Sequence, residues 1–200
     1  MPMLDLAPAA LEVERLLQGV SDNRLGDQTP CTGTSVAGLL DHLMGLTLAF
    51  TWAADKQSPP EGGPTGPGPA GSDNLDADWR AQLPRRLSDL VGAWREPAAW
   101  EGMTEAGGVR MPAEIMGVVA LDELVMHGWD LARATEQSFT CDPASTEAVL
   151  AFTSESARPE RAGSREGLFG PVVPVPDDAP AFDRALGYAG RDPHWTPASP

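Results

Sequence analysis

Two histidines and two acidic residues fall at spacings that suit a metal site. Glu123 and His127 stand four residues apart, and Asp130 follows three residues after His127. On an α-helix these three side chains project within about 60° of one another, because each residue advances the helix by about 100°. Their stripe is otherwise apolar, so burial there would require partners that compensate the charges.

His42 supplies a further imidazole in a second helical pattern. It lies beside an apolar stripe, and small residues on its other flank would let a neighbouring helix approach closely (Gly38, Gly45 and Ala49). A fold that faces His42 toward Glu123 and His127 would bring together two imidazoles and a carboxylate. This donor set suits Zn²⁺, Ni²⁺, Fe²⁺ or Mn²⁺. Three protein ligands leave coordination positions open, as in reactive metal sites.

Other interpretations of the same residues stay open. A Glu–His pair at this spacing also occurs on helix surfaces and as a satisfied pair in a core. Asp130 is interpreted as an acceptor that fixes the tautomer of a ligand histidine, as an acid or base near the site, or as a surface carboxylate. Cys31 is either a redox thiol near a helix N-terminus or a small packed residue. His194, in a proline-rich tail, is expected to be structural or exposed.

Helical periodicity predicts the elements that must position these residues. Helices are expected over about Pro8–Val20, Ser35–Ala54, Leu75–Trp94, Ala113–Thr135, Pro143–Ser156 and Phe182–Tyr188. Pro84 should kink or split the third of them. The fold class is therefore predicted as all-α: a four-helix bundle over residues 1–157, with an extended C-terminal extension over 158–200 that packs on it.

The chain contains 21 Gly and 20 Pro, and they gather in the connections between these helices. Gln57–Gly71 is predicted to be a long loop, and Gly107-Gly108 suggests a short hairpin within Trp100–Met111. Both segments are candidate walls for a pocket.

Charge and composition narrow the functional classes. The 200 residues suit one domain, and 29 acidic against 14 basic residues give a formal net charge of -15. Such a chain is repelled by nucleic acids and by anionic membranes. It has no apolar run of transmembrane length, no signal-peptide pattern at its N-terminus, and only two cysteines. We expect a cytoplasmic protein with neither nucleic-acid nor membrane partners; a homodimer stays open.

Several motifs resemble a known family. They are Thr29-Pro-Cys-Thr-Gly33, Leu39-Leu-Asp-His-Leu43, Leu121-Asp-Glu-Leu-Val-Met-His-Gly-Trp-Asp-Leu-Ala132, and the tail from Phe169 to Pro180 with Gly190-Arg-Asp-Pro193. Together they resemble the DinB-like superfamily, in the actinobacterial branch that contains mycothiol-dependent maleylpyruvate isomerase. The resemblance implies a four-helix bundle whose divalent metal, usually zinc, is held by His42, Glu123 and His127.

The chain departs from the family pattern in two ways. Thr34 stands where the family often has Trp, which would alter the pocket wall. The isomerase carries a further C-terminal domain that this chain is too short to contain. The missing domain argues against maleylpyruvate itself as the substrate.

The implied function is that of a divalent-metal-dependent enzyme with a small-molecule substrate and a low-molecular-weight thiol, mycothiol or a similar compound. A metal-coordinated thiol loses its proton, and the thiolate is the nucleophilic form. It would serve S-transfer to a small electrophile, or isomerisation if it adds and later leaves. The alternatives are a metal-water hydrolase, or a bundle that binds a metal or small molecule without turning it over.

Overall fold

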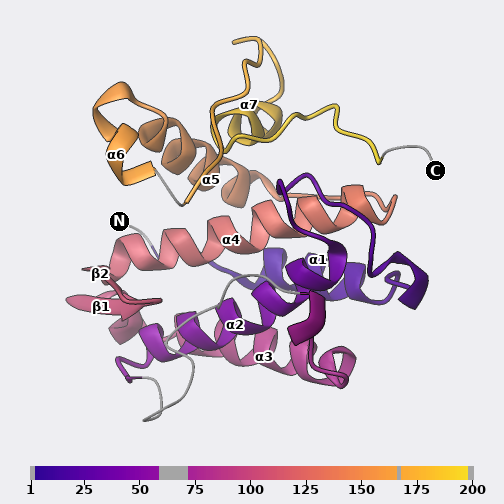
Figure 1. Ribbon diagram of the computed structural model, residues 1–200. Coiled ribbons are helices and arrows are strands. Elements are labelled where there is room, and N and C mark those ends of the chain that lie inside the picture. The colour runs from indigo at the N-terminus through magenta and orange to yellow at the C-terminus, as the bar shows by residue number, and fades with distance from the viewer. Residues whose placement is uncertain (1–2, 59–71, 166–167, 198–200) are drawn as a thin grey trace.

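The computed structural model describes residues 3–58, 72–165 and 168–197. The described chain is mostly helical and has one small two-stranded hairpin (Figure 1). Most of the predicted loop Gln57–Gly71 lies outside the described residues.

The predicted helices are present, with shifts at their ends. The principal helices are α1 (Ala7–Leu17), α2 (Val36–Ala54), α3 (Trp79–Trp94), α4 (Ala113–Ala134), α5 (Pro143–Ser156) and α7 (Ala181–Tyr188). A four-residue helix, α6 (Ala162–Arg165), was not expected from the sequence. Helix α3 begins at Trp79 and not at Leu75, because the Asp76 carboxylate accepts the Asp78 backbone N–H and turns the chain just before the helix.

Pro84 does not split α3, which is continuous across it. Proline removes one backbone hydrogen bond within a helix. Here the apolar face of α3 offsets that loss, since it is buried at helical spacing along the whole element (Trp79, Leu83, Leu87, Leu90, Val91 and Trp94). Tertiary packing of an apolar face contributes more to a helix than local propensity does.

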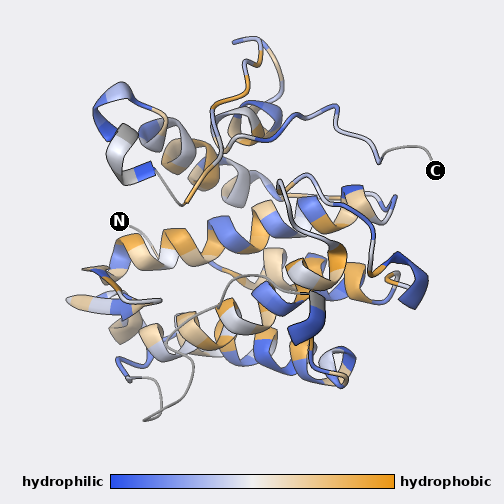
Figure 2. Ribbon diagram, viewed as in Figure 1, coloured by the Kyte–Doolittle hydropathy of each residue, from blue (hydrophilic) through white to orange (hydrophobic). Residues whose placement is uncertain are grey.

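Four helices share one hydrophobic core. Helix α2 packs against both α3 and α4, and α1 packs against α3 and α4. Apolar positions are spread along these helices (Figure 2), and the largest of them are buried in the core. Helix α2 is long and apolar enough to cross a membrane by length and composition, but 67% of it is buried inside the protein, as in a core helix.

The hairpin forms as predicted and adjoins α2 and α4. Strands β1 (Met103–Ala106) and β2 (Val109–Pro112) pair antiparallel through the turn Gly107-Gly108. Both glycines have positive φ, 59° and 79°, which a tight hairpin turn favours and side chains oppose. The Thr104 hydroxyl donates to the Ala53 carbonyl oxygen and so ties β1 to the last turn of α2.

The C-terminal segment returns to α4. Helix α5 packs against α4 and α7, and the chain beyond α7 passes beside the C-terminal end of α4 (Figure 1). The Arg133 guanidinium donates to the Trp195 carbonyl oxygen at 3.0 Å, which joins α4 to this segment. Gly190 has a φ of 81°, and a Cβ added to it would lie only 2.8 Å from the backbone of Gly170. A domain division at residue 157 stays a prediction.

Gly117 in α4 is a position where we expect a methyl group to destabilise the fold. A Cβ there would lie 2.5 Å from the Trp100 ring and 2.8 Å from the Trp94 ring. Gly117→Ala is therefore expected to lower the free energy of unfolding by about 1–3 kcal/mol, measured by urea unfolding. The control is Gly92→Ala, at an exposed position of α3 where a Cβ meets nothing within 4 Å. That change is expected to raise stability by about 0.5–1 kcal/mol, and equal losses in both variants would contradict the packing argument.

Candidate metal centre

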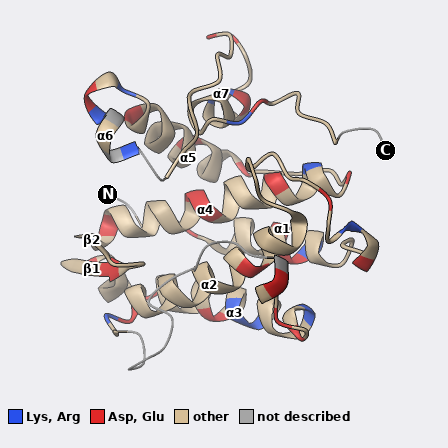
Figure 3. Ribbon diagram, viewed as in Figure 1, with Lys and Arg blue, Asp and Glu red and all other residues tan. Residues whose placement is uncertain are grey.

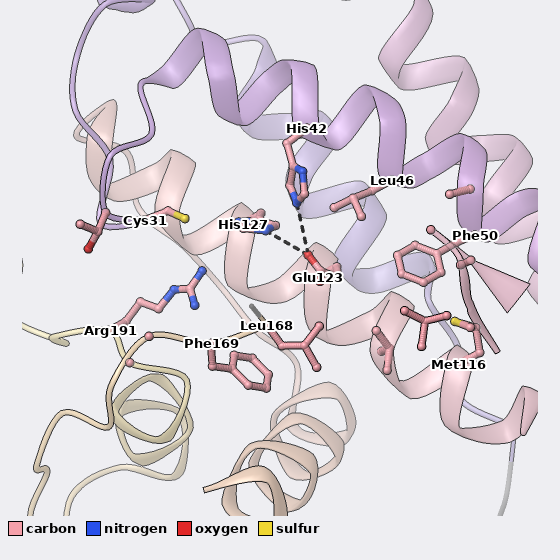
Figure 4. Close-up of a pocket in the computed structure, with 18 of the residues that line it drawn as sticks. Cys31, His42, Leu46, Phe50, Met116, Glu123, His127, Leu168, Phe169 and Arg191 are labelled. Atoms are coloured by element: carbon pink, nitrogen blue, oxygen red, sulfur yellow. Dashed lines mark ion pairs between the residues drawn. The ribbon is translucent and has the colours of Figure 1, made fainter. Parts of the chain in front are cut away.

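The three predicted donors converge between α2 and α4. His42 projects from α2, and Glu123 and His127 project from α4, with one ligand atom of each lying within 4.8 Å of the others. Glu123 Oε2 lies 3.0 Å from His127 Nε2 and 3.7 Å from His42 Nε2 (Figure 4). The two imidazole rings meet edge to face, with centroids 4.9 Å apart. The structure thus brings together the residues that the sequence pattern singled out.

Local structure explains why these side chains meet. The Ser35 hydroxyl accepts the Gly38 backbone N–H at 3.2 Å, which caps α2 and fixes the start of the helix that carries His42. Glu123 and His127 are one turn apart on α4, so both face α2. The three side chains differ in exposure: those of His42 and Glu123 are about a quarter exposed, and that of His127 is 8% exposed.

Asp130 lies behind His127 and has no exposed surface. Its Oδ2 lies 3.1 Å from His127 Nδ1 and accepts a hydrogen bond from the Nδ1–H group. The other ring nitrogen, Nε2, is thereby directed at Glu123. The Arg191 guanidinium pairs with the same carboxylate, with Nη2 2.9 Å from Oδ2 and Nε 3.4 Å from Oδ1 of Asp130. Complete burial excludes the interpretation of Asp130 as a surface carboxylate.

Arg191 is the residue of this site that sequence reasoning missed. It was noted only as part of the motif Gly190-Arg-Asp-Pro193, and 61 residues separate it from Asp130. A helical pattern reports neighbours within one helix, so it carries no signal for this contact. The sequence indicated only that a partner was needed, because burying the Asp130 carboxylate in an apolar stripe without a compensating cation is costly.

The buried charges shift one another's pKa values. Burial alone would raise the pKa of Glu123, but its hydrogen bonds to His127 and His42 hold that pKa well below its usual range. Burial alone would lower the pKa of His127, but hydrogen bonds to Asp130 and Glu123 raise it to about 10. The pKa of Asp130 is lowered, because the Arg191 charge and His127 outweigh its burial. Without a metal, the site is therefore a row of side chains with alternating charge: negative Glu123, positive His127, negative Asp130 and positive Arg191.

This row of alternating charges predicts how the free energy of unfolding depends on pH once a chelator has removed any metal. Because the pKa of His127 is raised from 6.5 to about 10 on folding, its stabilising contribution is complete below pH 6.5. The contribution declines as the pH rises and is lost above about pH 10. Urea unfolding between pH 6 and about 10 should therefore show falling stability. His127→Gln carries no such proton, so a wild-type profile no steeper than that of this variant would contradict the expectation.

A cavity of about 870 Å³ opens beside the donors. Cys31 and Arg191 lie at one end, the His/Glu cluster lies between, and Phe50 and Met116 lie at the other end (Figure 4). The hairpin contributes part of the wall, as expected for the Trp100–Met111 region, through Ala106, Gly107, Val109 and Met111. The C-terminal segment contributes Leu168, Phe169, Gly170 and Gly190.

The remaining candidate residues occupy different places. Cys31 lines the cavity as a free thiol, and the Thr34 hydroxyl lies 3.7 Å from its sulfur. His194 is exposed and does not line the cavity, in line with the expectation for the tail.

The fold and the donors define a class: a mostly helical protein with two imidazoles and a carboxylate converging beside a large pocket. Residues 6–132 match the family model of the mycothiol maleylpyruvate isomerase N-terminal domain, and the chain belongs to this family. The match contains His42, Glu123, His127 and Asp130, but not Arg191.

Known proteins similar to the chain fall into two kinds. Uncharacterized proteins from two strains of Mycobacterium tuberculosis are 27% identical over 177 residues, which cover 88% of this chain and 90% of theirs. The crystal structure of the mycothiol-dependent maleylpyruvate isomerase is similar with a TM-score of 0.55 and 18% identity. That similarity covers 74% of this chain and 66% of the isomerase chain, and it shows a shared fold.

Proposed function

We propose that this protein is a divalent-metal-dependent enzyme whose co-substrate is a low-molecular-weight thiol, mycothiol or a close analogue. The thiolate adds to a small electrophile, and it either stays bound as a thioether (S-transfer) or leaves again after the electrophile has isomerised. The observation that carries the proposal is the convergence of His42, Glu123 and His127 beside an open cavity of about 870 Å³. Membership of the mycothiol maleylpyruvate isomerase N-terminal domain family supports the choice of thiol. We further propose that the core helices form the DinB-like four-helix bundle.

The three residues fit a divalent cation. Ligand bonds of 2.0–2.2 Å in tetrahedral geometry place neighbouring donor atoms about 3.4 Å apart. The distances of 3.0 and 3.7 Å from Glu123 Oε2 to the two imidazole nitrogens bracket this value. Two imidazoles and a carboxylate suit zinc best, and nickel, iron or manganese also accept them.

Each residue around the donors has a role in this proposal. A bound divalent ion would act as a Lewis acid that lowers the pKa of a coordinated thiol. Asp130 accepts a hydrogen bond from the Nδ1–H group of His127, which would leave Nε2 free to bind the ion. Because Asp130 is completely buried, we assign it to positioning His127 and not to proton exchange with substrate.

A thiol-consumption assay tests the proposal. Zinc-loaded protein is mixed with mycothiol and a panel of epoxides, activated alkenes and chloroaromatics, and the remaining free thiol is measured with a disulfide dye. We expect thiol loss to be accelerated by the zinc-loaded protein and not by chelator-treated protein or Glu123→Gln. Isomerisation would conserve thiol, so product spectra are recorded in parallel for unsaturated substrates. No metal-dependent change across the panel would overturn the proposal in favour of a non-catalytic binding protein, and substrate loss without a thiol requirement would indicate a hydrolase.

A further inference from the structure

The cavity continues well past the donors between apolar walls. Helix α2 places Leu46 and Phe50 one and two turns beyond His42 on the same face, and α4 places Met116 two turns before Glu123. Two turns correspond to about 11 Å, since the helix rises about 5.4 Å per turn. A ligand that reaches the donors therefore has a long apolar channel for the rest of its structure (Figure 4).

The hairpin closes this channel with apolar side chains. Successive residues of a strand face opposite sides, so Val109 and Met111 line the cavity while Arg110 between them does not. Ala106, the cross-strand partner of Val109, also lines the cavity. The register of β1 and β2 thus directs the strand's basic residue away from the channel.

Within the described part of the chain, no Lys or Arg that lines the cavity is free to pair with an anionic ligand. Among the cavity-lining residues of the described chain, Arg191 is the only Lys or Arg, and it is 7% exposed. Its Nε and Nη2 are engaged by Asp130, and its Nη1 donates to the Ala189 carbonyl oxygen at 2.9 Å. The residues outside the described part contain no Lys, Arg or His. Acidic residues outnumber basic ones in the whole chain (Figure 3).

We propose that the electrophilic co-substrate is an uncharged, largely apolar molecule, with its apolar part between Phe50, Met116 and the hairpin and its reactive atom facing the His/Glu cluster. A carboxylate or phosphate on the part of the molecule between Phe50, Met116 and the hairpin would be buried away from the His/Glu cluster and from any free Lys or Arg, which is costly. The reactive end of this assignment rests on the proposed function. The apolar recognition itself requires no metal.

A matched pair of dyes tests the preference. N-phenyl-1-naphthylamine is uncharged, and 8-anilino-1-naphthalenesulfonate has the same aromatic frame with one added sulfonate. Both are titrated by fluorescence into zinc-loaded and chelator-treated protein, with metal content measured separately. We expect the neutral dye to bind at least about tenfold more tightly to chelator-treated protein, because the sulfonate finds no free Lys or Arg in the channel. The zinc-loaded protein is the comparison, because a bound ion offers the sulfonate a partner and should reduce this preference.

Two arginine variants of the hairpin locate the bound dye. Val109→Arg adds a cation at the channel and should tighten binding of the sulfonated dye by about threefold. Met103→Arg is the control, since Met103 lies on the same hairpin and does not line the cavity. Val109 and Met103 are 53% and 49% exposed, so both variants should fold.

Two outcomes would overturn the proposal: sulfonated dye bound as tightly as the neutral dye by chelator-treated wild-type protein, or the same response in both arginine variants. Protein that cannot hold zinc but keeps the dye preference would overturn the proposed function while supporting the apolar recognition.

Discussion

Glu123→Gln and His42→Ala are each expected to yield protein without bound metal. Wild-type protein should contain about one divalent ion per chain, measured by elemental analysis of purified protein. Each variant removes one of three donors that lie within 4.8 Å of one another. Changes to residues that only support ligands typically cost 10–100-fold in metal affinity, so we expect removal of a ligand to cost more than about 100-fold.

His194→Ala is the matched control for these variants. It removes the third histidine of the chain, which is exposed and lies outside the cavity. We expect it to retain wild-type metal content. Full occupancy in Glu123→Gln, with a circular dichroism spectrum like that of the wild type, would show that the ligand assignment is wrong.

Arg191→Met should produce the largest loss of stability among single substitutions at the site. Asp130 has no exposed surface, and its carboxylate would keep only His127 as a partner. Removing one member of a buried ion pair costs about 3–5 kcal/mol, because the other charge stays buried. Chemical unfolding of chelator-treated protein measures the change. Arg158→Met is the control: Arg158 and Glu155 form a largely exposed pair at 3.0 Å, and such pairs contribute less than about 1 kcal/mol.

The double variant Asp130→Asn with Arg191→Met distinguishes charge pairing from packing. It removes both charges while an amide oxygen can still accept the His127 Nδ1 proton, so most of the lost stability should return. Asp130→Asn alone should weaken zinc binding by about 10–100-fold, since a neutral acceptor holds the imidazole less firmly. A double variant no more stable than Arg191→Met, or Arg191→Met as stable as Arg158→Met, would contradict the ion-pair argument.

Much of the helical fold was predictable because its signals are local. The spacing of leucines and tryptophans located the principal helices, and Gly107-Gly108 located the hairpin turn. Pro84 misled the prediction in part, since its local cost is offset by the buried face of α3, which depends on tertiary packing. The late start of α3 depends on a side-chain turn at Asp76 that periodicity does not register.

The candidate site was predictable to the extent that one helix contains it. Glu123, His127 and Asp130 share a face of α4, and their helical spacing identifies them as a group. Helical spacing alone could not add His42 to the group, because the meeting of α2 and α4 depends on the whole core. The type of its neighbours and the family resemblance supplied it. The contacts made by Arg191, Leu168 and Phe169 are set by the path of the C-terminal segment, which has no periodic pattern.

The pairing of Arg191 with Asp130 also has a consequence for synthesis of the chain. The donors and Asp130 emerge from the ribosome 61 or more residues before Arg191 does. At about 5–20 residues per second, the nascent chain carries them for roughly 3–12 seconds before the guanidinium arrives. During that interval His127 has its acceptor, but the acceptor lacks its counter-ion. A metal bound in that interval would meet an imidazole whose acceptor is not yet held by Arg191, so we expect the site to reach its final rigidity only after the later segment has been translated.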